Sequence, residues 1–299
     1  MIWLILVLVI LYILALVAVT VCFVFPFRTP IFLSPGFLGT PQKSVEFTDP
    51  GTGKLLRGWW VPHPEPKVVM ICCHGFMMNR AELAPFASWF KDKSMAFLFF
   101  DFPAHGSSQG RRSGFGFREQ TAVVAAVAEA KKKYPAAKIV LAGSSMGAVA
   151  SAFAVSEDPG LVDGMILDSC YDRLVEAING WWVFLGGKKL RFFLYPVVWL
   201  GGPISGLNPF SVVVSKALAK VSVPTLILHG EADTLASVSH AESNFKALAG
   251  PKTLITFPDR NHSEARWEDP EKYYTEIEEF LQPYLVNERT RRGATQHQK

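Results

Sequence analysis

A serine flanked by two glycines is the clearest chemical signal in the chain. The segment 143–147 reads Gly-Ser-Ser-Met-Gly, follows the apolar run 139–142, and precedes Ala-Val-Ala at 148–150. This order predicts a buried strand, a tight turn and a helix, with the G-x-S-x-G pattern centred on Ser145. The glycines allow close backbone approach, and the serine stands above a helix N-terminus that favours negative charge. Ser144 fits less well, because the residues two positions away from it are not glycine.

A serine nucleophile needs a general base, and the chain offers seven histidines. His262 lies in the loop between the last predicted strand and the last predicted helix, where it can reach the edge of the sheet above the serine. The other histidines occupy a tail, a proline-rich loop, glycine-containing turns and a helix: His297, His63, His74, His105, His229 and His240. His262 is therefore the predicted base.

The acid that would orient this base has three candidates. Asp233 follows the predicted strand 223–228 in a turn that begins with His-Gly, and it is the favoured residue. Asp168, at the end of the preceding strand, is the rival, and Glu231 is a third possibility.

The oxyanion donors are predicted from position alone, because backbone N–H groups carry no side-chain signature. His74-Gly75-Phe76-Met77 follows the first buried strand, and its glycine lets the backbone turn its amides toward the serine. The predicted donors are the N–H groups of Phe76 (or Met77) and Met146.

Alternating strand and helix patterns predict the fold class. Two strands separated by a turn rich in Gly and Pro lead into repeated β-α-β units, which favour a mostly parallel sheet with helices on both faces. The predicted strands are 45–47, 55–61, 68–73, 95–102, 139–142, 161–167, 223–228 and 253–257, and the main helices are 117–133, 239–248 and 270–281. Asn79 followed by Glu82 resembles a helix cap.

The first residues predict a membrane anchor. Residues 2–25 contain no charged side chain and, at 1.5 Å per residue, would extend roughly 36 Å, enough to cross a hydrocarbon core of ~30 Å. No basic start or clean cleavage site indicates a removable signal. We expect an anchor over 1–27, a juxtamembrane linker over 28–43 and an α/β domain over 44–286. Arg28 and Lys43 follow the span, which favours a single-pass protein with a cytosolic catalytic domain.

The segment 170–220 separates two strands by about fifty residues and is rich in aromatic residues. It predicts a lid, and the substrate-contacting residues are expected to be Met77, Trp181, Trp182 and Phe193. The alternatives are a helical excursion that packs these aromatics on the body, and a contact with the membrane surface.

Composition excludes some classes of protein. The 299 residues are 49% hydrophobic and 19% charged, with a net charge of +4. This mild positive charge is scattered and does not suggest nucleic-acid binding, and the basic residues of 287–299 form a polar C-terminal tail.

Together these features resemble the α/β-hydrolase superfamily, and more closely its short-lid, membrane-anchored serine hydrolases. The matching features are His74-Gly75, the turn 101–108, the serine motif, the turn to Asp233, and His262. The order Ser145, Asp233, His262 is that of the family. The resemblance implies hydrolysis of an ester, thioester or amide through an acyl-enzyme, on a lipid or acylated small molecule or protein, without metal or organic cofactor. The alternatives are an acyltransferase that uses the same residues, and a binding protein without activity.

Overall fold

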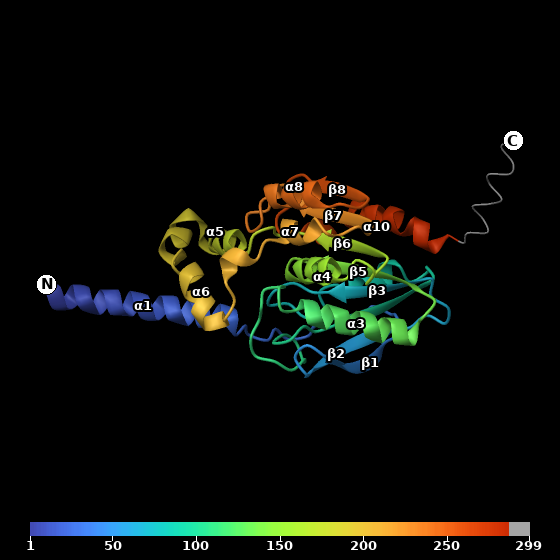
Figure 1. Cartoon of the computed structure of the whole chain (residues 1–299), viewed down its shortest axis with the longest axis horizontal. Helices are drawn as coiled ribbons and strands as arrows, with labels where there is room; N and C mark the ends of the chain where they lie inside the picture. The colour runs from blue at the N-terminus through green and yellow to red at the C-terminus, as the bar shows by residue number, and fades with distance from the viewer. Residues whose placement is uncertain (287–299) are drawn as a thin grey trace.

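The computed structural model describes residues 1–286, and the predicted polar tail 287–299 lies outside the described residues. Within this range, one eight-stranded sheet forms the centre of the molecule, in the order β1-β2-β4-β3-β5-β6-β7-β8 (Figure 1). The strands are β1 (Lys43–Asp49), β2 (Lys54–Val61), β3 (Val68–Cys73), β4 (Met95–Phe100), β5 (Lys138–Ser144), β6 (Gly164–Asp168), β7 (Thr225–Gly230) and β8 (Lys252–Phe257). β1 and β2 pair antiparallel, β2 pairs antiparallel with β4, and the other pairs are parallel. The predicted fold class is confirmed.

Helices cover both faces of this sheet. The helices of the described residues are α1 (Ile2–Val24), α2 (Pro85–Trp89), α3 (Gln120–Lys133), α4 (Met146–Glu157), α5 (Leu174–Leu194), α6 (Val197–Ser205), α7 (Val214–Leu218), α8 (Val238–Ala247), α9 (Ala265–Glu268) and α10 (Pro270–Leu285); α1, α5 and α6 lie beyond the sheet (Figure 1). Successive side chains of β3 point to opposite faces: Ile71 packs with α3 and α4, and Met70 packs with α2 and α10. The central strands are apolar on both faces because both faces are covered.

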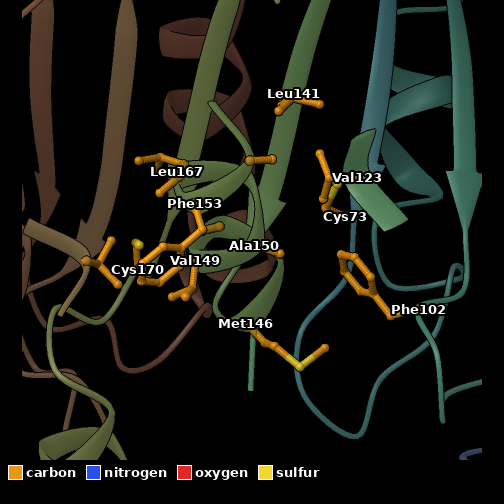
Figure 2. Packing of buried hydrophobic residues seen from close by; sticks show 14 of the residues in the cluster. Cys73, Phe102, Val123, Leu141, Met146, Val149, Ala150, Phe153, Leu167 and Cys170 are labelled. Carbon is orange, nitrogen blue, oxygen red and sulfur yellow. The ribbon is translucent and has the colours of Figure 1, made fainter. Parts of the chain in front are cut away.

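Helix α4 fixes the serine motif to the sheet (Figure 2). Its side chains Met146, Val149 and Phe153 belong to one buried cluster with Cys73 at the end of β3 and Leu167 of β6. Nearly every residue of α4 is buried. The serine turn is therefore fixed on both sides, by β5 before it and by the buried helix α4 after it.

Helix α1 is 23 residues long and apolar throughout, and by length and composition it could span a membrane. Its residues 2–15 are exposed, whereas Leu16, Thr20 and Val24 are buried. This spacing of four places the buried residues on one helix face. The C-terminal part of α1 lies beside α6, and its N-terminal part projects away from the domain (Figure 1).

The segment predicted as a juxtamembrane linker lies against the body. The Arg28 guanidinium donates hydrogen bonds to the carbonyls of His105, Gly106 and Gly110, at 3.0, 2.6 and 2.8 Å. The side-chain amide of Asn79 donates to Thr29 and Pro30. The chain that follows α1 is thus tied to the loops beside the sheet.

The predicted cap at Asn79 and Glu82 is wrong in one respect. Asn79 Oδ1 does accept from the N–H of Ala81 at 3.0 Å, but the following helix, α2, begins only at Pro85. The Glu82 carboxylate turns inward instead, where it accepts from three buried donors: the N–H of Gly75, the hydroxyl of Ser144 and the guanidinium of Arg266.

The segment predicted as a lid is largely helical. α5 is kinked at Gly186 and Gly187, where Gly187 has φ 74°, a backbone conformation that favours glycine. Trp182 is buried in the core, whereas other aromatic side chains of the segment are exposed: Phe184, Phe192, Phe193, Tyr195 and Trp199. One end of the lid packs on the body, and the other presents an aromatic surface beside α1.

Candidate active site

Ser145 occupies a strained turn between β5 and α4. Its φ of 49° and ψ of −112° are unusual for a residue with a Cβ. A Cβ at Gly143 would lie 2.5 Å from the amide nitrogen of Ala148, and one at Gly147 would lie 2.0 Å from the carbonyl oxygen of Cys73. Glycine is therefore required two residues before and two residues after the serine, because any side chain there would clash with the backbone.

His262 and Asp233 complete a row of side chains with Ser145. The Nε2 atom of His262 lies 2.9 Å from Ser145 Oγ, and its Nδ1 atom lies 2.7 Å from Asp233 Oδ2. An ionised carboxylate can only accept, so Nδ1 carries the proton and Nε2 is free to accept from the serine hydroxyl. The three side chains come from the ends of β5, β7 and β8, which meet at one edge of the sheet.

Asp233 is held in place by the backbone of its own turn. Its Oδ1 atom accepts from the N–H groups of Leu235 and Ala236 at 2.8 and 2.7 Å, and its side chain has no exposed surface. This leaves Oδ2 directed at the imidazole. The carboxylate thus has its orientation fixed before any substrate arrives.

The two rival acids are engaged elsewhere. Asp168 accepts from Tyr273 Oη and from Ser169 Oγ, both at 3.0 Å. Glu231 is exposed and accepts from Thr256 Oγ1 at 2.7 Å. Of the three candidates, only Asp233 hydrogen-bonds to His262 among residues 1–286.

Two other histidines near the site are buried and structural. His74 Nε2 accepts from the N–H of Phe102 at 3.0 Å, and His105 Nδ1 lies 3.0 Å from the carbonyl of Pro103. Burial lowers the pKa of His74 to about 4, although the Gly75 carbonyl and Glu82 act in the opposite direction. Burial, together with the neighbouring His74, lowers the pKa of His105 to about 3. Both rings are neutral at neutral pH.

The predicted oxyanion donors lie beside the serine. Phe76 and Met146 line the same cavity as Ser145. Within residues 1–286, neither of their N–H groups donates a hydrogen bond to another protein group. Met77 has φ 59° and packs against the core, and it is not among the residues that line this cavity.

A narrow apolar cavity, with room for little more than one water molecule, opens at Ser145. Most of its walls are aromatic or aliphatic: Phe23, Phe76, Phe115, Met146, Tyr171, Leu174, Ala177, Ile178, Trp181 and Leu235. Of the predicted substrate contacts, Trp181 lines it and Trp182 packs behind it against Phe23. Phe193 does not line it: this side chain is exposed, and its carbonyl accepts from Tyr12 Oη of α1 at 2.6 Å. Phe193 therefore lies on the outer part of the lid.

A buried ion pair lies behind the serine, and neither of its residues is among the predicted site residues. Arg266 Nη2 lies 2.8 Å from Glu82 Oε1 and 2.8 Å from Ser144 Oγ. Glu82 Oε2 accepts from the N–H of Gly75 at 2.6 Å, and Arg266 Nε donates to the carbonyl of Ser263 at 3.2 Å. The pair thus joins the loop of the oxyanion donors, the serine turn and the histidine loop.

Electrostatics favour the charged form of this arginine. Burial by itself would lower the pKa of Arg266, but Glu82 and Asp168 outweigh it and raise the pKa above its usual value. The sequence held one weak signal, an arginine four residues after the predicted base, and the cap motif at Glu82 indicated a different role for that residue. In the described part of the chain, no group of three or more His, Cys, Asp or Glu side chains is placed to hold a metal ion.

Comparisons with known proteins identify the family of this fold. The family model described as serine aminopeptidase, S33, matches residues 64–192. The protein YfhR of Escherichia coli K12 is 28% identical over 75% of this chain and 74% of its own length. The monoglyceride lipase of Rattus norvegicus is 31% identical over 60% of this chain and 70% of the lipase.

Solved structures give the same result. The esterase Pf2001 of Pyrococcus furiosus superposes with a TM-score of 0.74 and 26% identity, covering 88% of this chain and 99% of the esterase. The structure of Est1E from Butyrivibrio proteoclasticus with ferulic acid bound has a TM-score of 0.63 at 19% identity, covers 81% of this chain and 100% of Est1E, and shares the fold. The chain therefore belongs to the α/β-hydrolase superfamily, and it is a hydrolase of the esterase and lipase type.

Proposed function

We propose that this protein is a membrane-anchored serine hydrolase that cleaves an acyl ester through a covalent acyl-enzyme. The observation that carries the proposal is the position of His262, within hydrogen-bond distance of both Ser145 and Asp233. This geometry suits general-base activation of a serine hydroxyl. No step of the mechanism requires a metal or an organic cofactor.

The proposed reaction has two halves. In the first, Ser145 Oγ attacks the ester carbonyl carbon while its proton passes to His262 Nε2, and the N–H groups of Phe76 and Met146 stabilise the oxyanion. The carbon–oxygen bond to the alcohol then breaks, and His262 returns the proton to the leaving oxygen. In the second, water gives its proton to His262 and attacks the acyl-enzyme. The carboxylic acid leaves as the proton returns to Ser145. Asp233 holds the histidine tautomer and stabilises the imidazolium.

Membrane attachment is part of the proposal and rests on α1 and the lid. The exposed part of α1, residues 2–15, would extend only about 21 Å, less than the ~30 Å of a hydrocarbon core. If α1 crosses the bilayer, the adjoining lid surface of Phe192, Phe193 and Trp199 must enter the membrane interface with it. Aromatic side chains favour that region. The active site then faces the bilayer that supplies its substrate, with the catalytic domain on the cytosolic side.

An acylated lipid is the proposed substrate class. The cavity at Ser145 is walled by apolar side chains, and one of the relatives is a monoglyceride lipase. Pockets that are mostly apolar with a few polar groups suit ligands of this kind.

The test is covalent labelling of the full-length protein with a fluorophosphonate, followed by product analysis on a panel of acyl esters. We expect the wild type to be labelled and to release free carboxylic acid. Ser145→Ala should abolish both, whereas Ser239→Ala, at an exposed serine on α8, should change neither. A folded sample without labelling would contradict the proposal. Acyl transfer to an added alcohol in place of water would identify an acyltransferase.

A further inference from the structure

We propose that the C-terminal turns of α1 form one wall of the acyl-chain site, so that the membrane helix itself sets the chain length of the substrate. The inference rests on the proposed function, and it specifies the ligand: a single alkyl chain, with its carbonyl at Ser145 and its methyl end between α1 and α6.

Phe23 of α1 is the first observation. Its side chain lines the cavity at Ser145 together with Phe76 and Trp181. Its ring is stacked on that of Phe76, with centroids 5.7 Å apart, and it meets the rings of Trp181 and Trp182 edge-on at 5.9 and 4.8 Å. A residue of the predicted membrane span therefore touches the loop that carries an oxyanion donor.

A second cavity lies directly beyond Phe23. It is narrow in this structure, with room for little more than one water molecule, and it is bounded by α1, α5, α6 and the loop after α6. It shares four lining residues with the cavity at Ser145: Phe23, Phe115, Leu174 and Ile178. These side chains form a common wall. Rotation of Phe23 away from Phe76 would join and widen the two narrow spaces into one path from Ser145 to the side of the membrane helix.

The chemistry of the second cavity selects an alkyl chain. Its walls are almost entirely apolar, and its two hydroxyl groups are already used by the backbone. Thr20 Oγ1 donates to the carbonyl of Leu16 at 2.8 Å, and Ser205 Oγ accepts from the N–H of Leu207 at 3.1 Å. A polar head group placed there would lose its hydrogen bonds to water and find no protein partners, whereas methylene groups make no hydrogen bonds that burial could break. The cavity therefore suits the hydrocarbon end of a substrate.

The other face of α5 has the opposite character. Leu235 lines the cavity at the serine and also borders a wider cleft with polar and charged walls, among them Asn179, Lys188 and Arg191. The alcohol part of an ester would leave on this wet side. The direction of the substrate follows: the alcohol points toward the polar cleft, and the acyl chain points toward α1.

Two substitutions test the inference in opposite directions. Gly201 of α6 lines the second cavity, and a Cβ added there meets no atom within 4 Å. Gly201→Leu should fill the cavity and lower the ratio of kcat/KM for a dodecanoyl ester to that for an acetyl ester by about tenfold or more. Phe23→Ala should remove the common wall and raise the same ratio. Phe25→Ala is the matched control, because Phe25 lines neither cavity, and it should leave the ratio within about twofold.

The measurement uses full-length protein in phosphatidylcholine nanodiscs. A second experiment does not depend on a variant: a long-chain alkyl fluorophosphonate with a diazirine at its chain end is attached to Ser145, with loss of fluoride, and then photolysed. Cross-links should fall in residues 16–24 or 197–209. Cross-links confined to the polar cleft, or ratios unchanged in both Gly201→Leu and Phe23→Ala, would overturn the inference while Ser145 labelling still supports the hydrolase. A folded wild-type protein that is not labelled at all would instead contradict the proposed function.

Discussion

The Arg266 guanidinium lies 2.8 Å from the Glu82 carboxylate, and both side chains are buried directly behind Ser145. Glu82 also accepts from the Gly75 N–H, and Arg266 also donates to the Ser263 carbonyl. One ion pair therefore joins the loop that precedes Phe76 to the loop that carries His262. We infer that this pair positions the oxyanion donor and the base relative to each other.

Arg266→Gln should destabilise the protein and slow turnover, because it leaves the Glu82 carboxylate buried without its charged partner. Loss of one member of a buried pair costs about 3–5 kcal/mol in the free energy of unfolding. Lys93→Gln provides the comparison: Lys93 pairs with Glu278 at the surface, and such pairs contribute about 0–1 kcal/mol. Denaturant unfolding and kcat measure both effects. Equal losses in the two variants would contradict a special role for the buried pair.

Asp233→Asn should lower kcat by about 10⁴ while leaving the fold intact. The amide oxygen can still accept from the N–H groups of Leu235 and Ala236, but the amide nitrogen would face His262 and impose the wrong tautomer. Glu231→Gln should leave turnover unchanged, since Glu231 contacts Thr256 instead. Steady-state kinetics and circular dichroism test this. Near-normal turnover in Asp233→Asn would return the acid role to Asp168.

His74 should make stability depend on pH. Because burial lowers its pKa to about 4, the unfolded chain binds its proton first as the pH falls. The His74 contribution to stability is therefore full above about pH 6.5 and is lost progressively between there and about pH 4. In that window the unfolding free energy of the wild type should fall by about 1.4 kcal/mol per pH unit more than that of His74→Gln.

The comparison of the wild type with His74→Gln isolates His74 from its charged and titratable neighbours. Glu82 and His105 face His74, and both are retained in the variant. The two proteins should show parallel pH profiles above pH 7, where His74 is neutral in both the folded and the unfolded chain. Identical slopes at lower pH would show that His74 carries no linked proton.

Removal of residues 2–15 should leave the domain intact, because this part of α1 is exposed. Removal of residues 2–28 should lower the melting temperature and weaken Ser145 labelling. The longer deletion takes away the buried Leu16 and Val24, the Phe23 wall and the three hydrogen bonds of Arg28. Thermal unfolding and fluorophosphonate labelling in one detergent compare the two. Equal melting temperatures would contradict the packing of α1 on the domain.

The sequence by itself determined the strands and helices and the position of the nucleophile, because these depend on residues that are close together in the chain. Gly143 and Gly147 mark a turn that tolerates no Cβ, so the position of the nucleophile could be read from spacing alone. Apolar runs such as Val68–Cys73 predicted strands buried on both faces. The loop position of His262 was enough to single it out, because residues after parallel strands collect at one edge of the sheet.

Only the tertiary structure decided the contacts that depend on distant segments. Helix α1 is apolar on every side, so its sequence carried no sign that Leu16, Thr20 and Val24 would pack on the domain. Glu82 matched a helix cap locally, yet it pairs with Arg266 because folding brings together residues that lie 184 positions apart. The local sequence determines backbone preference and burial. The partner of a buried charge depends on which distant segments the packing of the whole chain brings together.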